Sequence, residues 1–315
     1  MAINIVRYED DGRARWGVVR SEGVAPLEGD YPTTAALIVN GAADWRAAAA
    51  AAPPLALSDL RLLAPVTTPC RIFCQGANYR QHMIESGLDP DEKTFNMFFT
   101  KSDASIAPAV GCTKRPSHVA LLDYEIELAL IFGHTIDAPV TVTAADLPRY
   151  VFAIAVANDL SARDVQLPQT QFFKGKSYRG FLPIGPWLTV LDPDDFAAID
   201  RLDLHLAVNG ETRQRDSVVN LVFKPAETIS ELSTFANVSP GDVLLTGTPS
   251  GCALRVPPPA VRRIMQLLPE RRFWSLFRTS QSKRREYLQE GDRIEASIRT
   301  ADARIDLGLQ HTLIE

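Results

Sequence analysis

The sequence predicts an α+β, β-rich fold made of a large domain preceded by a smaller one. The chain has 315 residues, of which 46% are hydrophobic, so it is long enough to bury a large core. Between about residues 66 and 250, short β-like runs alternate with clusters of turn residues, and few long helical periods intervene. This pattern lacks the regular strand and helix alternation of a doubly wound fold and favours a mixed, strand-rich architecture.

A small α/β domain is expected over residues 1–65. Residues 3–8 and 15–20 are β-rich and flank the segment 10–12, Asp-Asp-Gly, which is typical of a hairpin turn. Residues 23–27 provide a candidate third strand.

The second half of this domain is expected to be helical and then to lead into a connection. Six alanines follow the segment 42–46, a composition with high helix propensity, and Pro53 and Pro54 end the predicted helix. Residues 54–66 are expected to form the boundary with the large domain, 66–315.

The runs that predict strands in the large domain are short and mostly apolar, and they lie at residues 71–76, 127–132, 152–158, 187–191, 204–209 and 243–247. A different composition follows them. Residues 255–286 contain nine Lys or Arg against two Glu, with apolar residues at helical spacing, namely Val261, Ile264, Met265 and Leu268. This segment predicts one or two basic amphipathic helices inserted between strands, with a surface hairpin preferred over a pocket cap, a subunit contact or a membrane contact.

Charge and hydropathy limit the classes of partner. The net charge of -5 provides no basic field for nucleic acid or an anionic membrane surface, which favours a small-molecule substrate. The opening apolar run is too short for a signal-peptide core, and no run approaches the length that spans a membrane, so the cytoplasm is expected. Cys70, Cys74, Cys112 and Cys252 have neither disulfide nor zinc-site spacing and are expected to be small buried hydrophobes.

An acidic strand is the first candidate site. In the segment 123–128, acidic and apolar residues alternate, so a strand would place Asp123, Glu125 and Glu127 on one face. The apolar residues that follow indicate that the strand enters a core, where like charges repel unless a cation neutralises them. Oxygen ligands favour Mg²⁺, Mn²⁺ or Ca²⁺, whereas a solvated edge strand is the alternative for this segment taken alone.

A second acidic element supports the cation site. Residues 152–157 are a nearly continuous apolar run, expected to be a buried strand, and Asn158 and Asp159 come directly after it. Asp159 at such a strand end is a suitable metal ligand, although it or Ser161 can equally cap a turn.

Six segments together resemble the fumarylacetoacetate hydrolase family, in the branch of acylpyruvases and 2-hydroxyhepta-2,4-diene-1,7-dioate isomerases. They are FCQGANYRQHMIE, DYEIELALIFG, VANDLSARDVQ, KGKSYRGFLPIGPW, VNGE and GDVLLTGTPSG, in this order between about residues 70 and 252. The resemblance implies a mixed β-sandwich or β-roll catalytic domain, a homodimer and an N-terminal domain like that of many members. The chain departs from the family after Gly251, where Cys252, Ala253 and the basic insertion follow.

The resemblance also implies roles for individual residues. It implies that Glu125, Glu127 and Asp159 bind Mg²⁺ or Mn²⁺, that Lys176 lies beside the metal, and that His82 and Glu85 form a catalytic pair in a mobile lid. It further implies substrate contacts or ordering of the site by four residues, Tyr79, Arg163, Gln166 and Thr248.

The residue types agree with this chemistry. His82 and Glu85 are three apart and share a face of a helical turn, so the carboxylate can orient the imidazole that takes a proton from water. Lys176 can balance negative charge and pair with a substrate carboxylate or a developing enolate. Gly247 allows a sharp turn after a strand and a close approach to a ligand, although an ordinary turn has the same composition.

The working hypothesis is a metal-dependent hydrolase that cleaves a carbon–carbon bond in a 2,4-dioxo acid resembling an acylpyruvate, with a role in the catabolism of aromatic compounds. A decarboxylase of oxaloacetate-like acids and an isomerase of 2-hydroxydienoates use the same enolate chemistry and are the alternatives. A non-catalytic binding protein on this fold is a remote alternative, because none of the ligand or lid residue types is lost.

Overall fold

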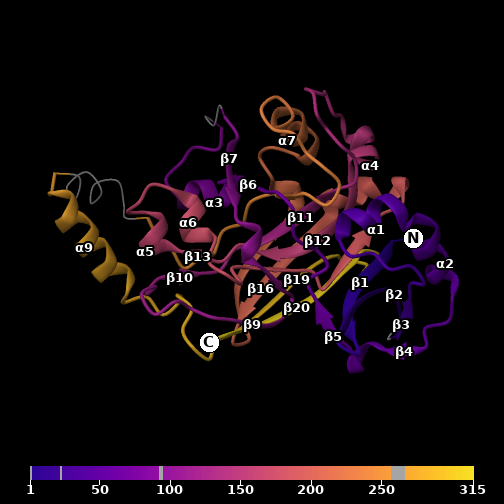
Figure 1. Cartoon of the computed structure of the whole chain (residues 1–315). Helices are drawn as coiled ribbons and strands as arrows, with labels where there is room; N and C mark the ends of the chain where they lie inside the picture. Colours follow the sequence, from indigo (N-terminus) through magenta and orange to yellow (C-terminus); the bar gives the residue numbers. More distant parts are fainter. Residues whose placement is uncertain (1, 22, 92–94, 257–266) are drawn as a thin grey trace.

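The computed structural model describes residues 2–21, 23–91, 95–256 and 267–315, and in these residues it is a strand-rich α+β protein (Figure 1). The described strands form three sheets. The largest contains thirteen strands, β1 (Ile3–Asp10), β2 (Arg13–Arg20), β3 (Gly23–Pro26), β4 (Leu55–Ala56), β5 (Arg61–Leu63), β6 (Ile72–Gly76), β7 (Met97–Lys101), β8 (Ile106–Pro108), β11 (Ile126–Phe132), β12 (Val151–Asn158), β14 (Leu182–Ile184), β15 (Trp187–Val190) and β18 (Val243–Leu245).

The second sheet has five strands in the order β17-β16-β19-β20-β9. Their bounds are β9 (Val110–Thr113), β16 (Leu202–Val208), β17 (Glu211–Ser217), β19 (Arg293–Thr300) and β20 (Asp306–Ile314). A third, two-stranded sheet pairs β10 (Leu122–Asp123) with β13 (Ser161–Ala162). The five-stranded sheet packs on the large one, because the main hydrophobic core combines side chains of β11 and β12 with side chains of β16, β19 and β20.

Strands β11 and β12 lie at the centre of the large sheet, which explains why their sequences are almost continuously apolar. Leu128 and Leu130 face the main core, whereas Ala129 and Ile131 face a second core on the opposite side of the sheet. The second core also contains side chains of the N-terminal helices, so the large sheet is covered on both faces. Both strands therefore provide a rigid base for the residues at their ends.

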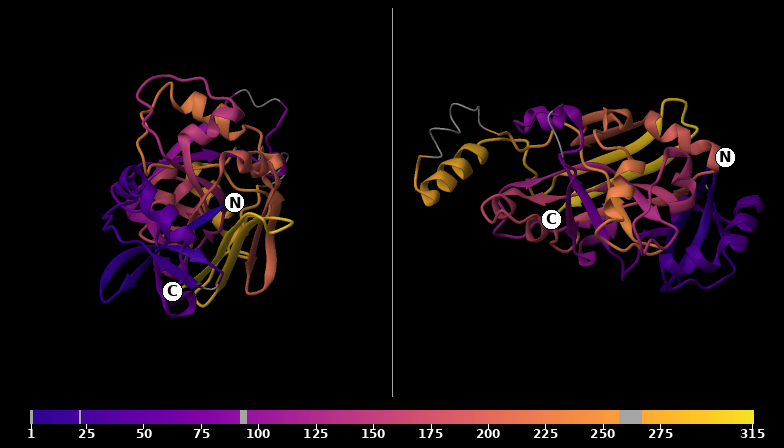
Figure 2. Two further views of the ribbon diagram at one scale, coloured as in Figure 1. Left: turned by 90° about the vertical axis from the view of Figure 1, so that its right-hand side faces the viewer. Right: turned by 90° about the horizontal axis from the view of Figure 1, so that it is seen from above.

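The N-terminal strands form as expected. Strands β1, β2 and β3 form a meander, and helices α1 (Thr34–Asn40) and α2 (Ala42–Ala50) follow them. Strand β1 also pairs with β15, so the first 65 residues extend the large sheet (Figure 2). The division into two domains at residue 65 stays a prediction.

The remaining helices are short and lie mainly in the connections. They are α3 (Arg80–Glu85), α4 (Leu147–Tyr150), α5 (Arg163–Gln166), α6 (Phe172–Lys176), α7 (Pro225–Leu232) and α9 (Glu270–Gln281), with 3₁₀ turns at Leu57–Asp59, Asp103–Ser105, Ala144–Asp146, Pro193–Arg201 and Val218–Asn220. No helix among the described residues is both long and apolar enough to cross a membrane. Localisation in the cytoplasm stays a prediction.

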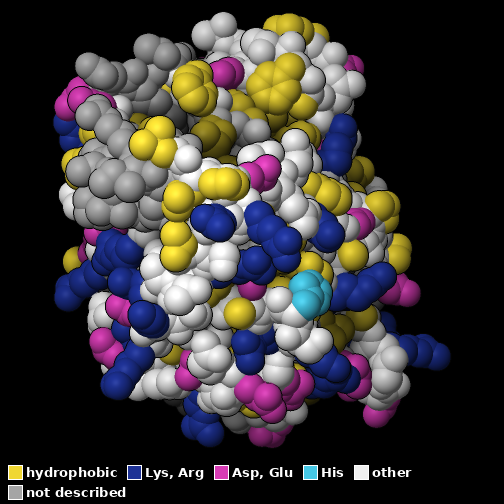
Figure 3. All heavy atoms as spheres, turned by 90° about the vertical axis from the view of Figure 1, so that its left-hand side faces the viewer, with side chains coloured by type: hydrophobic (Ala, Val, Ile, Leu, Met, Phe, Trp, Pro, Cys, Tyr) yellow, Lys and Arg dark blue, Asp and Glu magenta, His cyan; other side chains and the backbone are white. Residues whose placement is uncertain are grey.

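The basic insertion contains helix α9, which extends from one end of the molecule (Figures 1 and 2). Its residues Phe277 and Gln281 are buried, and the partly buried Trp274 packs against the main core. Lys and Arg side chains are spread over the face of the molecule that carries this helix (Figure 3). Three of the four apolar residues that predicted helical spacing here, Val261, Ile264 and Met265, lie outside the described residues.

The four cysteines are free, and the expectation that all are buried is wrong for one of them. Cys74 and Cys252 are buried and Cys70 is half-buried, but Cys112 is exposed. Cys112 lies in β9, at the edge of the five-stranded sheet.

Candidate metal centre and active site

Three carboxylates meet where β11 and β12 end. Glu127 lies in β11, Glu125 comes just before this strand, and Asp159 comes directly after β12. The antiparallel register pairs Glu127 with Ala157, and the Asp159 N–H donates to the Glu125 carbonyl at 2.8 Å. The pairing of two buried strands thus brings together acids that are 32 to 34 residues apart in the sequence.

The triad is compact and buried. One carboxylate oxygen from each of Glu125, Glu127 and Asp159 lies within 4.8 Å of the others, and the three residues are 6%, 1% and 0% exposed. Strand β11 is paired on both sides, with β12 and β18, so the alternative of a solvated edge strand is wrong.

The sequence predicted one continuous strand over the acidic segment 123–128, but the structure divides this segment between two strands. Strand β10 ends at Asp123 and β11 begins at Ile126, because the Glu125 N–H donates to the Asn158 side chain at 2.9 Å and leaves the strand ladder. Asp123 turns to Arg163 and to the N–H groups of the 253–254 segment instead of joining the triad.

Two lysines form ion pairs with Glu125 and Asp159 of the triad. Lys176 Nζ donates to Glu125 Oε2 at 2.7 Å, to Asp159 Oδ2 at 2.5 Å and to Ser161 Oγ at 2.8 Å. Lys101 Nζ donates to Asp159 Oδ1 at 2.5 Å. All three protons of the Lys176 ammonium are therefore in use within the protein, so in this arrangement its contribution is charge and the orientation of the two carboxylates.

Arg163 joins the triad to its surroundings. Its guanidinium forms ion pairs with Asp123, at 2.9 Å, and with Glu125, and its Nη1 donates to Gln166 Oε1 at 2.9 Å. Residues Arg163 and Gln166 are the two ends of α5, and Gly175 of α6 lets the two helices approach, because a Cβ there would lie 2.8 Å from the Gln166 backbone nitrogen. The geometry thus brings Arg163, and through it Gln166, to the triad, and these are two of the four residues predicted to contact substrate or order the site.

The pKa values of the carboxylates diverge. Burial alone would raise the pKa of Glu125, but the adjacent Arg163 and Lys176 lower it to about 2. The pKa of Glu127 is raised well above its usual value, first by burial and then by the charges of Asp159 and Glu125. Glu127 receives one direct hydrogen bond, from the Gly247 N–H at 2.7 Å.

This donor set fits a hard divalent cation. Three buried carboxylates with only oxygen atoms suit Mg²⁺, Mn²⁺ or Ca²⁺ better than zinc. Burial and the charges of Asp159 and Glu125 raise the pKa of Glu127 despite the nearby Lys176, and a cation bound between the three residues would offset this repulsion. The triad could therefore hold a divalent metal, and the identity of the metal belongs to the proposal below.

A cavity of about 230 Å³ opens onto Glu125 and Glu127. His82, Arg163 and Lys176 line it as well. Its remaining walls are largely apolar, with Leu88, Met97, Phe99, Leu167, Phe172, Leu254 and Val256. Burial lowers the pKa of His82, so its ring is neutral at pH 7 and able to accept a proton.

Two predicted site residues lie away from this cavity wall. Glu85, at the end of α3, is bound by Arg255 Nη1 at 2.7 Å and by the Gly251 N–H at 3.3 Å, and no hydrogen bond among the described residues joins it to His82. Tyr79 is fully buried in the main core, and its hydroxyl has no hydrogen-bond partner among the described residues. Their catalytic and substrate-binding roles stay predictions.

The turn after β18 contributes Thr248 to the wall of the cavity. Gly247 has a φ of 89°, as a sharp turn requires, and a Cβ at this position would lie 3.0 Å from the Asn78 Cβ. This close approach aims the Gly247 N–H at Glu127. Thr248 lines the cavity, and its hydroxyl accepts a hydrogen bond from Gln214 at 2.8 Å.

Two residues that contact the triad, Lys101 and Ser161, were not predicted as site residues from the sequence. Lys101 is the last residue of β7, and its ammonium also donates to the backbone carbonyls of Lys176 and Phe181. A lysine that ends an apolar strand run, MFFTK, was the available signal, because such a charge needs a buried partner. Ser161 lies in the same segment as Asp159, where only its capping role was considered.

Comparisons with known proteins identify the family to which this chain is similar. Residues 71–310 match the family described as "Fumarylacetoacetate (FAA) hydrolase C-terminal", and residues 4–65 match "Rv2993c-like, N-terminal". The chain is 36% identical to the oxaloacetate tautomerase YisK of Bacillus subtilis over 209 residues, which are 66% of this chain and 68% of that protein. It is 31% identical to the 2,4-didehydro-3-deoxy-L-rhamnonate hydrolase of a Sphingomonas strain, over 81% of this chain and 87% of that protein.

A solved structure supports the fold over the whole chain. A probable 2-hydroxyhepta-2,4-diene-1,7-dioate isomerase from Mycobacterium abscessus superposes with a TM-score of 0.73 and 28% sequence identity. The superposition covers 100% of this chain and 98% of that chain. The names of these similar proteins include a tautomerase, a hydrolase and an isomerase, so similarity alone leaves several reactions open.

Proposed function

The chain belongs to the fumarylacetoacetate hydrolase family, and from this premise we propose that it catalyses the enolisation of a 2-oxo acid, with the tautomerisation of an oxaloacetate-like acid as its reaction. The observation that carries the proposal is the buried triad of Glu125, Glu127 and Asp159, because its two glutamates line a cavity that His82 also lines. An enolisation needs stabilisation of an oxyanion and a group that moves a proton, and the triad with its metal would supply the first and His82 the second.

Glu125, Glu127 and Asp159 would hold Mg²⁺ or Mn²⁺. When bound, such an ion supplies Lewis-acid stabilisation of negative charge on a 2-oxo group. Lys176 and Lys101 orient Asp159 through ion pairs, and Arg163 orients Glu125 in the same way. These three cations hold the carboxylates in place before substrate arrives, so little reorganisation is needed during the reaction.

His82 is the proposed proton carrier. As a neutral imidazole it accepts the proton of the enol hydroxyl, and as imidazolium it returns a proton to the neighbouring carbon. The enol and keto forms therefore have the same composition. Burial favours the neutral ring between steps, because it lowers the pKa of His82. Thr248 and Gln166, which share the cavity wall, would orient the substrate.

Hydrolysis of a carbon–carbon bond in an acylpyruvate-like acid is the second candidate. It is favoured by the neutral His82, which can take a proton from water, and by the apolar side chains of the cavity, which suit an acyl group. In this reaction water adds across the broken bond, and a carboxylic acid and pyruvate leave. We rank it second because Glu85 is bound to Arg255 and not to His82, so the pair that would activate water is not assembled.

The two candidates differ in products, which gives the test. The full-length protein, loaded with Mg²⁺ or Mn²⁺, is incubated with enol oxaloacetate, with acylpyruvates and with a 2-hydroxydienoate, and ultraviolet absorbance and proton NMR are followed. The proposal predicts faster conversion of enol to keto oxaloacetate than in buffer, without release of CO₂ or a carboxylic acid. Cleavage of acylpyruvates without any effect on oxaloacetate would reject the tautomerase in favour of the hydrolase. Release of CO₂ from oxaloacetate would reject it in favour of a decarboxylase. Isomerisation of the dienoate alone would replace it with the isomerase.

The cellular setting is a separate part of the proposal. A homodimer and a role in aromatic catabolism remain predictions from the family resemblance. Size-exclusion chromatography with light scattering measures the first, and turnover of ring-fission products in the same assay addresses the second.

A further inference from the structure

The segment that begins the insertion is tied to the helix that carries His82. Arg255 Nη1 lies 2.7 Å from Glu85 Oε2, and the Gly251 N–H donates to the same oxygen at 3.3 Å. Glu85 and His82 are on one helix, α3, three residues apart. The ion pair therefore connects the insertion to the proposed proton carrier.

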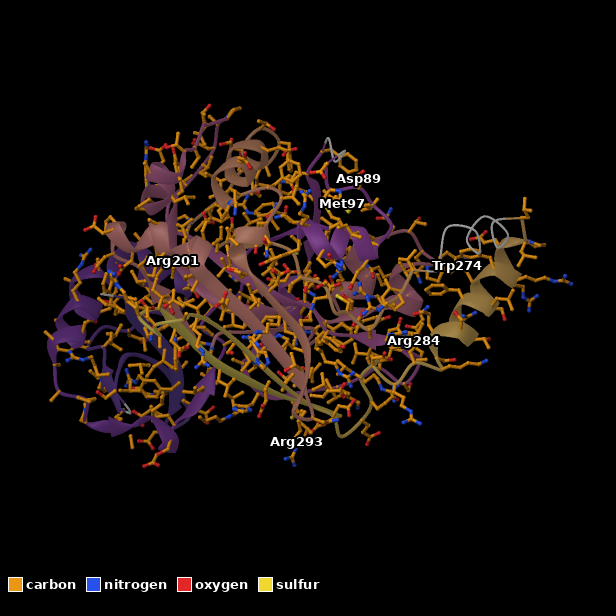
Figure 4. The ribbon with its side chains drawn as sticks, turned by 180° about the vertical axis from the view of Figure 1, so that it is seen from behind. Asp89, Met97, Arg201, Trp274, Arg284 and Arg293 are labelled. Atoms are coloured by element: carbon orange, nitrogen blue, oxygen red, sulfur yellow. The ribbon has the colours of Figure 1, made fainter. Side chains whose placement is uncertain are left out.

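The far end of the insertion fixes Arg255 in turn. Gln281, the last residue of α9, donates from Nε2 to the Arg255 carbonyl at 3.0 Å, and its Oε1 accepts from the Arg255 N–H at 3.4 Å. Arg284 donates to the Ala253 carbonyl at 2.9 Å, and the Tyr287 hydroxyl donates to Gln281 at 2.9 Å. Figure 4 shows Arg284 where the insertion rejoins the body of the protein. The two ends of the insertion thus clamp each other beside the cavity.

This contact lies between two segments that line the cavity. Leu254 and Val256, on either side of Arg255, line it, and so do His82, Ser86 and Leu88 of the segment that contains Glu85. Helix α3 has only six residues and no side-chain cap at its N-terminus, so its position depends on tertiary contacts and not on its own stability.

We propose that Arg255 is a positioning residue, which acts through Glu85 to hold α3, and with it His82, against the wall formed by the insertion. This inference rests on the proposed function only for the expected change in kcat, and the expected change in hydrogen exchange is independent of it. The Arg255 side chain is 44% exposed and that of Glu85 is 27% exposed, so the pair is accessible to salt and contributes modestly. The contact involves one nitrogen and one oxygen, which a lysine ammonium can reproduce.

The test compares Arg255→Gln and Arg255→Lys with the wild-type chain. Hydrogen exchange of residues 79–88 is measured without substrate. Steady-state kinetics are measured with whichever of the oxaloacetate, acylpyruvate and dienoate substrates the protein converts. In Arg255→Gln we expect exchange about five times faster and kcat lower by about the same factor, with KM less affected, because an exposed ion pair is worth up to about this factor. Arg255→Lys should restore both values. NaCl should accelerate exchange in the wild type but not in Arg255→Gln.

The matched control is Arg61→Gln, which breaks an exposed 2.7 Å ion pair with Glu9 far along the sheet and should leave both measurements unchanged. Unchanged exchange, kcat and salt dependence in Arg255→Gln would overturn the inference. Faster exchange in a protein that turns over none of the substrates would sustain the inference and reject the proposed function, so the two failures are distinguishable.

Discussion

Lys101 Nζ lies 2.5 Å from Asp159 Oδ1, and both side chains are fully buried. A buried ion pair of this kind is costly to break, because removing one charge leaves the other without a partner in the interior. Lys101 also donates to the carbonyls of Lys176 and Phe181, so it joins β7, α6 and the triad at one point.

Replacing Lys101 with methionine should therefore destabilise the fold. We expect Lys101→Met to lower the free energy of unfolding by about 3 kcal/mol, measured by urea denaturation. The control is Lys114→Met, which removes an exposed lysine and should have an effect within about 0.5 kcal/mol. Equal midpoints for the two variants would contradict the structural role given to Lys101.

His82→Gln tests the proton carrier. We expect turnover to fall by about 100-fold or more, while Mn²⁺ affinity stays that of the wild type, because His82 is not one of the triad residues. Near wild-type turnover in this variant would show that another group moves the proton.

The pH profile provides an independent check on His82. Since burial lowers the pKa of His82, the ring becomes protonated only at a pH below its usual value of 6.5. The acid limb of kcat/KM should therefore lie below pH 6.5, with full activity at pH 7. An acid limb above pH 7 would contradict the neutral imidazole.

Arg163→Lys tests the planar bridge between Asp123, Glu125 and Gln166. A lysine retains the charge but cannot make three contacts in the plane of a guanidinium. We expect cation affinity to fall by about tenfold and unfolding stability by about 1–3 kcal/mol, measured by calorimetry and denaturation. Equal values in wild type and variant would mean that charge alone suffices at this position.

Local sequence patterns were enough to predict much of the fold. The hairpin, α2 and the strands β6, β11, β12, β16 and β18 were expected because their apolar runs and turn residues are local signals. The break between Asp123 and Ile126 was not expected from the sequence, since it depends on the side chain of Asn158, which lies in strand β12. Such a tertiary hydrogen bond leaves no mark in the periodicity of the segment itself.

The difference between local sequence signals and tertiary contacts also explains which site residues were predicted. Glu125 and Glu127 were identified from the alternation of acidic and apolar residues in the segment 123–128, and Asp159 was identified because it follows a buried strand. Their common role as metal ligands followed from the family resemblance. The partner of Glu85 could not be predicted, because Arg255 lies 170 residues away and reaches it only through the path of the insertion. Lys101 was missed for a similar reason, since its carboxylate partner is 58 residues distant.

The central claim, that the triad holds a divalent cation, is tested most directly by titrating Mn²⁺ into the full-length wild type and Glu127→Gln by calorimetry. The amide keeps the shape of Glu127 and relieves its repulsion with Glu125 and Asp159, so the variant should remain folded, which circular dichroism verifies. Glu9→Gln, at an exposed ion pair, is the matched control. The account predicts one site per chain in the wild type and in the control, and affinity weaker by about 100-fold in Glu127→Gln. Equal Mn²⁺ affinity in all three proteins would contradict it.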